Sequence, residues 1–221
     1  MVSVEIIIEE VITMLEIINT IRRDGNELFL DKTNNFKAKL EDFWMWAHSD
    51  LLGNAERGIL AEYIVALALG VNLGTRTEWD SYDIITDGGI KVEVKSSGYI
   101  QTWFQKTYSE IKFGIQPTQA WDKGSNTYES SKKRQADVYV FCIHMHKEQE
   151  TINPLDLQQW EFYVLNSNVL NKKVSLQKSI LLNPLKKLGA VPCNFECLKE
   201  VVNNEYNRGI SNNLVSEEYK I

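Results

Sequence analysis

The sequence has few of the residues that build disulfide frameworks and metal clusters. Only three cysteines and three histidines occur among 221 residues. An odd number of cysteines argues against a disulfide framework and favours a reducing, cytoplasmic setting. Cys193 and Cys197 stand four residues apart with no second pair after them, so structural zinc is a minor alternative. His144 and His146 would share one face of a strand, where imidazoles that bind no metal are the commoner case.

The sequence also lacks an uninterrupted apolar run that could cross a membrane. The apolar stretch from Val2 to Ile21 carries four glutamates, which a secretory signal or a spanning helix would not tolerate. Its apolar residues recur with a helical period, which predicts a surface helix over about residues 4–22 with one buried stripe. We therefore expect no membrane segment.

An excess of basic residues is absent as well, since the net charge is −6. The charge is unevenly distributed, because residues 1–62 contain twelve acidic and six basic residues and the remainder is neutral overall. The segment from Phe162 to Phe195 contains five lysines and no acid. This segment is either a solvated face or a local phosphate-contacting surface, and both interpretations stay open.

Apolar periodicity and turn residues predict an α/β protein that begins with helices. The helix over 54–69 is bounded by Asn54 as N-cap and by Gly70 as a C-terminal stop. The other predicted helices span about 4–22, 35–48, 169–170, 181–188 and 195–205, and the predicted strands span about 81–86, 90–96, 136–144 and 159–165. This order predicts an α/β sandwich with a mixed central sheet.

The chain divides by composition into three parts. We expect an N-terminal helical elaboration over 1–50, a core over 51–206 and a frayed tail over 207–221. Within the core, the segment 115–133 is rich in hydroxyl residues, with a proline and a glycine, and is expected to be a long loop. No internal repeat or long linker divides the core further.

Three charged residues flank the predicted hairpin in a pattern typical of metal-dependent chemistry. Glu93 and Lys95 point to one face of their strand, because side chains alternate along a strand. Asp83 stands on the preceding strand, across a turn with two consecutive glycines. An ammonium beside Glu93 can orient or deprotonate a water molecule, or stabilise charge on a phosphate oxygen.

The register of this hairpin decides whether the two acids meet. A three-residue loop over 87–89 pairs Thr86 with Ile90 and places Asp83 opposite Glu93, with Cβ atoms about 4.5–5.5 Å apart. Two carboxylates at that distance repel each other unless a cation neutralises them, and a divalent cation with oxygen ligands would do so. A two-residue loop would turn Asp83 to the other face, and no site would form.

Asp83, nine intervening residues and the tripeptide Glu93-Val-Lys95 resemble the core motif of the PD-(D/E)xK nuclease superfamily. The resemblance covers about residues 54–145, with a helix before the motif and a buried strand after it. Tyr82 stands where the family's motif has proline. The resemblance implies a restriction-endonuclease-like αβ sandwich, in which helices flank a mixed central sheet.

The same resemblance implies a Mg²⁺ site in which Mn²⁺ would substitute. Its expected ligands are Asp83, Glu93, Glu62 and the main-chain carbonyl near Val94. Glu62 is set among apolar residues of the helix over 54–69, where a bare acid is costly, so a paired acid is the alternative. Gln101 matches a glutamine that follows the motif in several subfamilies, and a surface turn is equally open. Nearby Tyr99 and Trp103 either stack on bases or pack internally.

These observations predict a metal-dependent DNA endonuclease that hydrolyses phosphodiester bonds. The expected catalytic residues are Asp83, Glu93, Lys95, Glu62 and Gln101. A type II restriction-like enzyme, a repair or junction-type nuclease and a phage-type nuclease all fit the motif, and a homodimer is expected if both strands are cut. The alternatives are a catalytically silent DNA- or protein-binding module on the same fold, or an unrelated α/β domain with an accidental motif.

Overall fold

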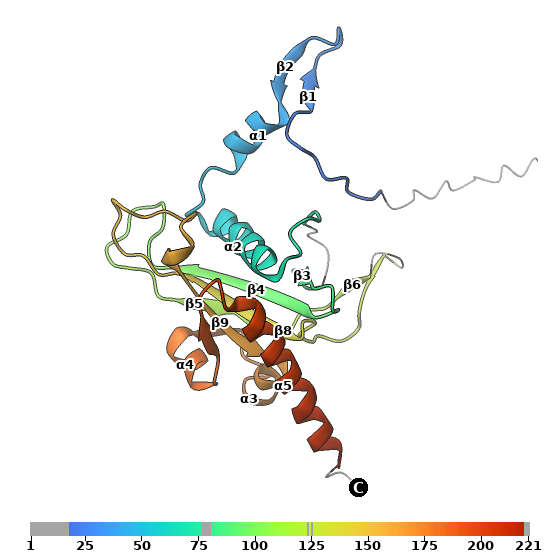
Figure 1. The fold of residues 1–221 in the computed structure, drawn as a ribbon, viewed down its shortest axis with the longest axis vertical. Coiled ribbons are helices and arrows are strands. Elements are labelled where there is room, and N and C mark those ends of the chain that lie inside the picture. The colour runs from blue at the N-terminus through green and yellow to red at the C-terminus, as the bar shows by residue number, and fades with distance from the viewer. Residues whose placement is uncertain (1–17, 77–80, 123, 125, 219–221) are drawn as a thin grey trace, which may run out of the picture.

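A five-stranded mixed sheet forms the centre of the protein in the computed structural model, which describes residues 18–76, 81–122, 124 and 126–218 (Figure 1). Its strands lie in the order β11-β9-β8-β4-β3, and the pair β4–β8 is parallel while the other pairs are antiparallel. Their bounds are β3 (Ile84–Ile85), β4 (Lys91–Gly98), β8 (Val138–His144), β9 (Trp160–Asn166) and β11 (Val191–Cys193). The prediction of a mixed α/β sheet is confirmed.

Strand β8 lies in the middle of the sheet because all seven of its residues can be buried. Its sequence is apolar at every position except the terminal histidine, and each residue is buried. A strand buried on both faces needs such a continuous apolar run rather than an alternating one. The sequence predicted this strand, and the structure confirms it within two residues at its start.

Helices and short strands cover the two faces of the sheet. One face packs against α2 (Asn54–Leu69) and α5 (Leu198–Glu218), which also contact each other. The opposite face packs against β5 (Lys112–Gly114), β10 (Ser179–Leu181), α3 (Ser167–Lys173) and α4 (Leu182–Lys187). Alternate residues of β8 serve the two cores, so Val140 faces α2 and Phe141 faces β5.

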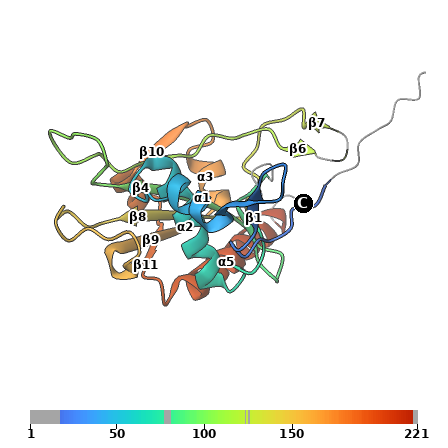
Figure 2. The ribbon, with the colours of Figure 1, turned by 90° about the horizontal axis from the view of Figure 1, so that it is seen from above.

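The segment predicted to be a long loop carries a small hairpin of its own. Strands β6 (Trp121–Asp122) and β7 (Thr127–Tyr128) pair antiparallel, and Thr118 forms a bridge with Lys133. This hairpin extends from the margin of the body (Figure 2). The short 3₁₀ helix η1 (Leu157–Gln159) precedes β9.

The region before residue 50 differs from the predicted helical elaboration. It projects from the body (Figure 1) as a hairpin of β1 (Leu28–Leu30) and β2 (Phe36–Lys39), followed by α1 (Leu40–Ala47). The prediction of one helix over 35–48 is therefore wrong for its first part. Asp31 is the cause, because its carboxylate accepts the Thr33 and Asn35 amides and so closes a turn.

The predicted helix over residues 4–22 falls mostly outside the described residues. Residues 1–17 are not described, and residues 18–22 have no helical structure. This part of the prediction is therefore wrong where it can be compared.

The boundaries of α2 and α5 correct two further predictions. Gly53 is the N-cap of α2, and Asn54 is its first helical residue, whose side chain accepts a hydrogen bond from Arg57. Gly70 ends the helix in a left-handed conformation with φ of 81°, as predicted. The expected frayed tail is instead helical up to Glu218.

Among the described residues, no helix combines the length and apolar character that crossing a membrane requires.

Close packing of α5 against the end of β9 generates a test of the fold. A β-carbon on Gly209 would lie 2.6 Å from Asn166 Cγ, whereas one on Gly58 would meet no atom within 4 Å. Asn166 cannot move freely, because it donates to the Glu205 carbonyl and accepts from the Asn168 amide.

Gly209→Ala should lower the free energy of unfolding by about 1–3 kcal/mol through overpacking. Gly58→Ala should raise the free energy of unfolding by roughly 0.5–1 kcal/mol, because alanine is the better helix former. Urea denaturation of both variants measures the two effects. Equal effects at the two positions would contradict the described packing.

Candidate functional site

The hairpin between β3 and β4 has the three-residue loop on which the site depends. Ile84 pairs with Val92, and the Thr86 amide donates to the Ile90 carbonyl at 3.0 Å. Gly89 takes a φ of 80°, which glycine adopts without strain. Extended by one position, this register places Asp83 opposite Glu93.

Asp83 is held at the edge of β4 by two hydrogen bonds. Its amide donates to the Val92 carbonyl at 3.1 Å, and the Val94 amide donates to Asp83 Oδ2 at 2.7 Å. On a strand, the amide and the carbonyl of one residue point to the same side. The Val94 carbonyl therefore points to the sheet edge at which Asp83 lies.

Glu93 and Lys95 form a close ion pair on the neighbouring face of β4. The distance from Lys95 Nζ to Glu93 Oε1 is 2.5 Å. The Lys95 side chain is 30% exposed and the Glu93 side chain 20% exposed. Burial raises the pKa of Glu93, Lys95 opposes that shift, and Asp83 adds to it. Burial tends to lower the pKa of Lys95, but the negative charge of Glu93 and of the other acids raises it overall. The lysine is therefore held protonated by its carboxylate neighbours.

Glu62 lies on α2 and is paired with an arginine that the sequence did not single out. Arg76 Nε donates to Glu62 Oε2 at 2.6 Å, and Arg76 Nη2 donates to Glu62 Oε1 at 3.1 Å. Burial raises the pKa of Glu62, while Arg76 lowers it and Asp83 raises it further. Glu62 is therefore a paired acid in this structure, which is the alternative that the sequence left open. The Glu62 carboxylate still lies within electrostatic reach of Asp83 and Lys95.

Two cavities adjoin these residues. Glu62, Arg76 and Asp83 line a cavity of about 350 Å³ whose other walls are mainly apolar. Glu93 and Lys95 line a second cavity of about 190 Å³. Asp83 and Glu93 are opposed in the hairpin register, so each of two neighbouring acids lines one of the two cavities.

The oxygen donors present suit a hard divalent cation. Mg²⁺ is usually bound through one or two carboxylates and completes its coordination with water and substrate phosphate. Asp83, Glu93 and the Val94 carbonyl are such donors, and Asp83 lies within electrostatic reach of Glu93 and accepts from the Val94 amide. Within the described part of the chain, no three acidic, histidine or cysteine side chains gather closely enough to hold a metal on their own. Glu62, the third expected ligand, is engaged by Arg76.

Gln101 lies in a buried polar network around Arg57 rather than beside Glu93. Its Oε1 accepts from Arg57 Nη1 at 2.9 Å, and its Nε2 donates to the Gly98 carbonyl at 3.0 Å. The Arg57 guanidinium also donates to the Leu52 carbonyl and to the Asn54 side chain. The structure therefore gives Gln101 contacts typical of a residue that positions the loop after β4.

Arg57 is the second important residue that the sequence reasoning missed. It is 3% exposed, and burial lowers the pKa of its guanidinium. A signal was present, because Arg57 stands one helical turn before Ala61 and two before Ile64 and Val65 on the buried stripe of α2. A charged residue on such a stripe needs buried acceptors. No comparable sequence signal marks Arg76.

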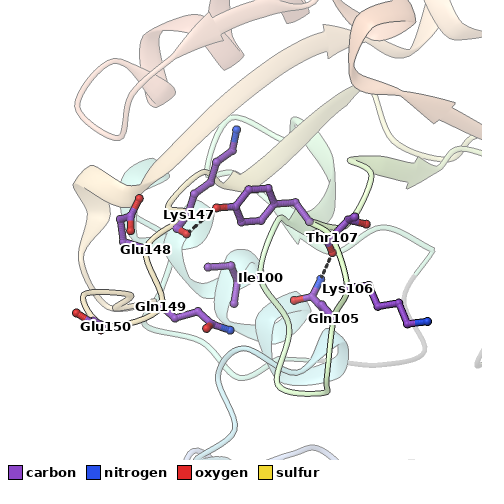
Figure 3. Close-up of a pocket in the computed structure, with 9 residues that line it drawn as sticks. Ile100, Gln105, Lys106, Thr107, Lys147, Glu148, Gln149 and Glu150 are labelled. Carbon is purple, nitrogen blue, oxygen red and sulfur yellow. Dashed lines mark hydrogen bonds between the residues drawn. The ribbon is translucent and has the colours of Figure 1, made fainter.

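The loops that follow β4 and β8 enclose a cavity of about 670 Å³ (Figure 3). Tyr108 donates to the Lys147 carbonyl at 3.2 Å, and Lys147 Nζ lies 4.2 Å from the centre of the Tyr99 ring. Lys106 and Lys147 extend away from Ile100, which lies at the centre of the view. Among the described residues, two lysines (Lys106 and Lys147) and two glutamates (Glu148 and Glu150) line the cavity, so its charged residues balance.

The other singled-out residues lie away from the hairpin. Cys193 ends β11 rather than standing on a helix with Cys197, and all three cysteines are free. His144 is buried against Trp160, and the His146 ring is within hydrogen-bond distance of Thr151 at 2.7 Å. The five lysines of the acid-free segment are exposed on and around α3 and α4.

The hydrogen bond from Val94 to Asp83 generates a second test. Asp83→Ala removes the acceptor, whereas Asp83→Asn keeps an oxygen in the same place. Both changes remove one negative charge, so their difference isolates the hydrogen bond. We expect Asp83→Ala to be less stable than Asp83→Asn by about 1–2 kcal/mol in urea denaturation. Asp87→Ala, in the exposed loop of the same hairpin, should change stability little, and equal stability of the two Asp83 variants would contradict the assignment.

Comparison with known proteins supplies the family. A search of curated proteins and a search of solved structures each return no match. The family model described as bacteriophage T4 endonuclease IV matches residues 16–184, about three quarters of the chain. The matched range includes α2, the hairpin of β3 and β4, and all the site residues described above. The chain therefore belongs to the bacteriophage T4 endonuclease IV family.

Proposed function

We propose that this protein is a Mg²⁺-dependent DNA endonuclease whose site is of the PD-(D/E)xK type on a restriction-endonuclease-like fold. Membership of an endonuclease family supports the nuclease activity and DNA as the substrate. One observation carries the assignment of the site: the hairpin register sets Asp83 opposite Glu93, with Lys95 paired to Glu93 at 2.5 Å. These are the residue types and positions that metal-assisted phosphodiester hydrolysis needs.

Asp83, Glu93 and the Val94 carbonyl would hold the cation at the edge of β4. When bound, Mg²⁺ would neutralise charge on the phosphate and lower the pKa of an attacking water. Lys95 holds its proton at Nζ beside Glu93, from where it can orient that water or stabilise a phosphate oxygen. Glu62 adds negative charge from α2.

The charge distribution indicates where DNA would lie. Glu93 and Lys95 are the register partners of Tyr139 and Phe141 in β8, and both aromatic residues face the layer of α3 and α4. The exposed lysines on and around these helices are therefore on the same side of the sheet as the ion pair. This placement favours the phosphate-contacting interpretation over a merely solvated face.

One active site cleaves one DNA strand. Double-strand cutting in the manner of a type II restriction-like enzyme would therefore require a homodimer. Gln101 would assist phosphodiester hydrolysis indirectly, through the loop that it positions after β4. Mn²⁺, with its similar preference for oxygen ligands, should replace Mg²⁺.

The proposal predicts cleavage of supercoiled plasmid DNA with Mg²⁺ or Mn²⁺ and none with EDTA. Asp83→Asn, Glu93→Gln and Lys95→Met should each reduce the cleavage rate by about a hundredfold or more, because each removes a ligand or the ammonium. The measurement is the loss of the supercoiled band with time on an agarose gel.

Lys91→Met is the matched control, because it makes the same change four residues earlier on the same strand. It should cleave at close to the normal rate. Cleavage by Glu93→Gln at the unmodified rate, or cleavage that persists in EDTA, would falsify the proposed site. Binding of DNA without cleavage by the unmodified protein would favour the silent module.

The raised pKa values of Glu93 and Glu62 predict the pH dependence of metal binding. Burial is the main cause for both, and metal binding requires the charged carboxylates. Protons should therefore compete with Mg²⁺ at a pH above 4.5, the ordinary pKa of glutamate. In calorimetric titrations of the DNA-free protein, Mg²⁺ affinity should weaken as the pH falls from neutral. An affinity that stays constant until the ordinary glutamate range would contradict the described burial.

A further inference from the structure

Arg76 makes the most directional contact with an acid near the candidate site. Its Nε and Nη2 atoms engage both carboxylate oxygens of Glu62, which is the two-pronged geometry of a guanidinium on a planar anion. The Glu62 side chain is 16% exposed and the Arg76 side chain 38% exposed. The arginine therefore reaches from solvent onto a partly buried carboxylate.

This contact keeps Glu62 from acting as a metal ligand. Both of its oxygens accept hydrogen bonds from Arg76, and the described residues contain no cluster of three acidic ligands. Glu62 nevertheless acts electrostatically on Glu93 and Lys95.

The charge balance of the site shows what would move Arg76. Glu62, Asp83 and Glu93 bring three negative charges, and Lys95 and Arg76 bring two positive charges, so the group is one charge negative. A divalent cation makes the same group one charge positive. The single negative charge of a DNA phosphate would restore neutrality.

The cavity beside Arg76 is suited to the part of DNA next to that phosphate. Arg76, Glu62 and Asp83 line it together, and Ile59, Val71 and Ile84 contribute apolar walls. Its volume of about 350 Å³ is within the range of small-molecule sites and suits a sugar or a base. A guanidinium at its wall can reach an anion without entering a buried position.

From these contacts, and resting on the proposed metal-dependent activity, we infer that Arg76 binds a phosphate of the DNA substrate. In the protein without metal and DNA, Glu62 takes the place of that phosphate. With a cation bound, Glu62 would turn towards Asp83 and Glu93, and the Arg76 guanidinium would pass from that carboxylate to the phosphate, whose oxygens it can also engage in a two-pronged manner. Arg76 is thus a substrate-binding residue that also limits metal binding when DNA is absent.

Arg76→Met tests this inference, because it removes the charge and keeps the length of the side chain. Without its competitor, Glu62 should bind Mg²⁺ better, and calorimetry of the DNA-free protein should show an affinity about fivefold higher. The kcat/KM for plasmid cleavage should fall about a hundredfold. With Ca²⁺ in place of Mg²⁺, the salt dependence of DNA binding should lose about one phosphate contact.

The opposite signs of these effects separate substrate binding from structural support. If Arg76 merely positioned Glu62 as a ligand, Arg76→Met would weaken Mg²⁺ binding, and that result would overturn the inference. Unchanged cleavage or an unchanged salt dependence would overturn it as well. Unmodified protein that binds no Mg²⁺, or cleaves no DNA, would instead contradict the proposed function itself.

Arg208→Met is the matched control, because Arg208 pairs with the buried Glu205 at 2.8 Å on α5, far from the hairpin along the chain. It should alter neither Mg²⁺ affinity nor cleavage. Circular dichroism reports whether Arg76→Met folds. If it does not, Arg76→Lys carries the test: the charge stays but the two-pronged contact is lost, so kcat/KM should fall about tenfold while Mg²⁺ affinity does not fall.

Discussion

Repulsion between carboxylates at the edge of β4 is the constraint on which the site depends. Asp83 and Glu93 face each other across the hairpin, and Glu62 adds its charge from α2. The fold tolerates this crowding because two cations, Lys95 and Arg76, each neutralise one acid. The remaining negative charge is what makes the edge receptive to a further cation.

The architecture creates this edge by ending one strand early. β3 contains only two residues, whereas β4 runs on to Gly98. Where β3 ends, the Val94 amide has no strand partner and takes the Asp83 carboxylate instead. A backbone amide in such a position must find an acceptor, and here the acceptor is also a candidate metal ligand.

A buried arginine, Arg57, connects the site to the rest of the molecule. Arg57 joins the start of α2 to Ser96 on β4 and to Gln101 in the loop that follows, so the helix that carries Glu62 is tied to the strand that carries Glu93. Burying a guanidinium is costly unless its donors are satisfied, and the partners of Arg57 among the described residues are neutral oxygens. Arg57 therefore fits a structural role, whereas Arg76, more exposed and paired with an acid, fits exchange with a substrate.

The local sequence determined the features that depend on local patterns. The apolar run of β8, the glycine that ends α2 and the double glycine of the β3–β4 turn each follow from neighbouring residues. That turn allowed two registers, and the structure shows the one that brings Asp83 to Glu93. Near the N-terminus the same reasoning was wrong, because the Asp31 turn outweighed helical propensity. The tertiary structure alone decided the partners of Glu62 and Gln101, since Arg76 and Arg57 reach them from positions that no spacing rule connects. Hydrogen-bond registers are set over a few residues, whereas ion pairs across elements depend on how whole helices pack.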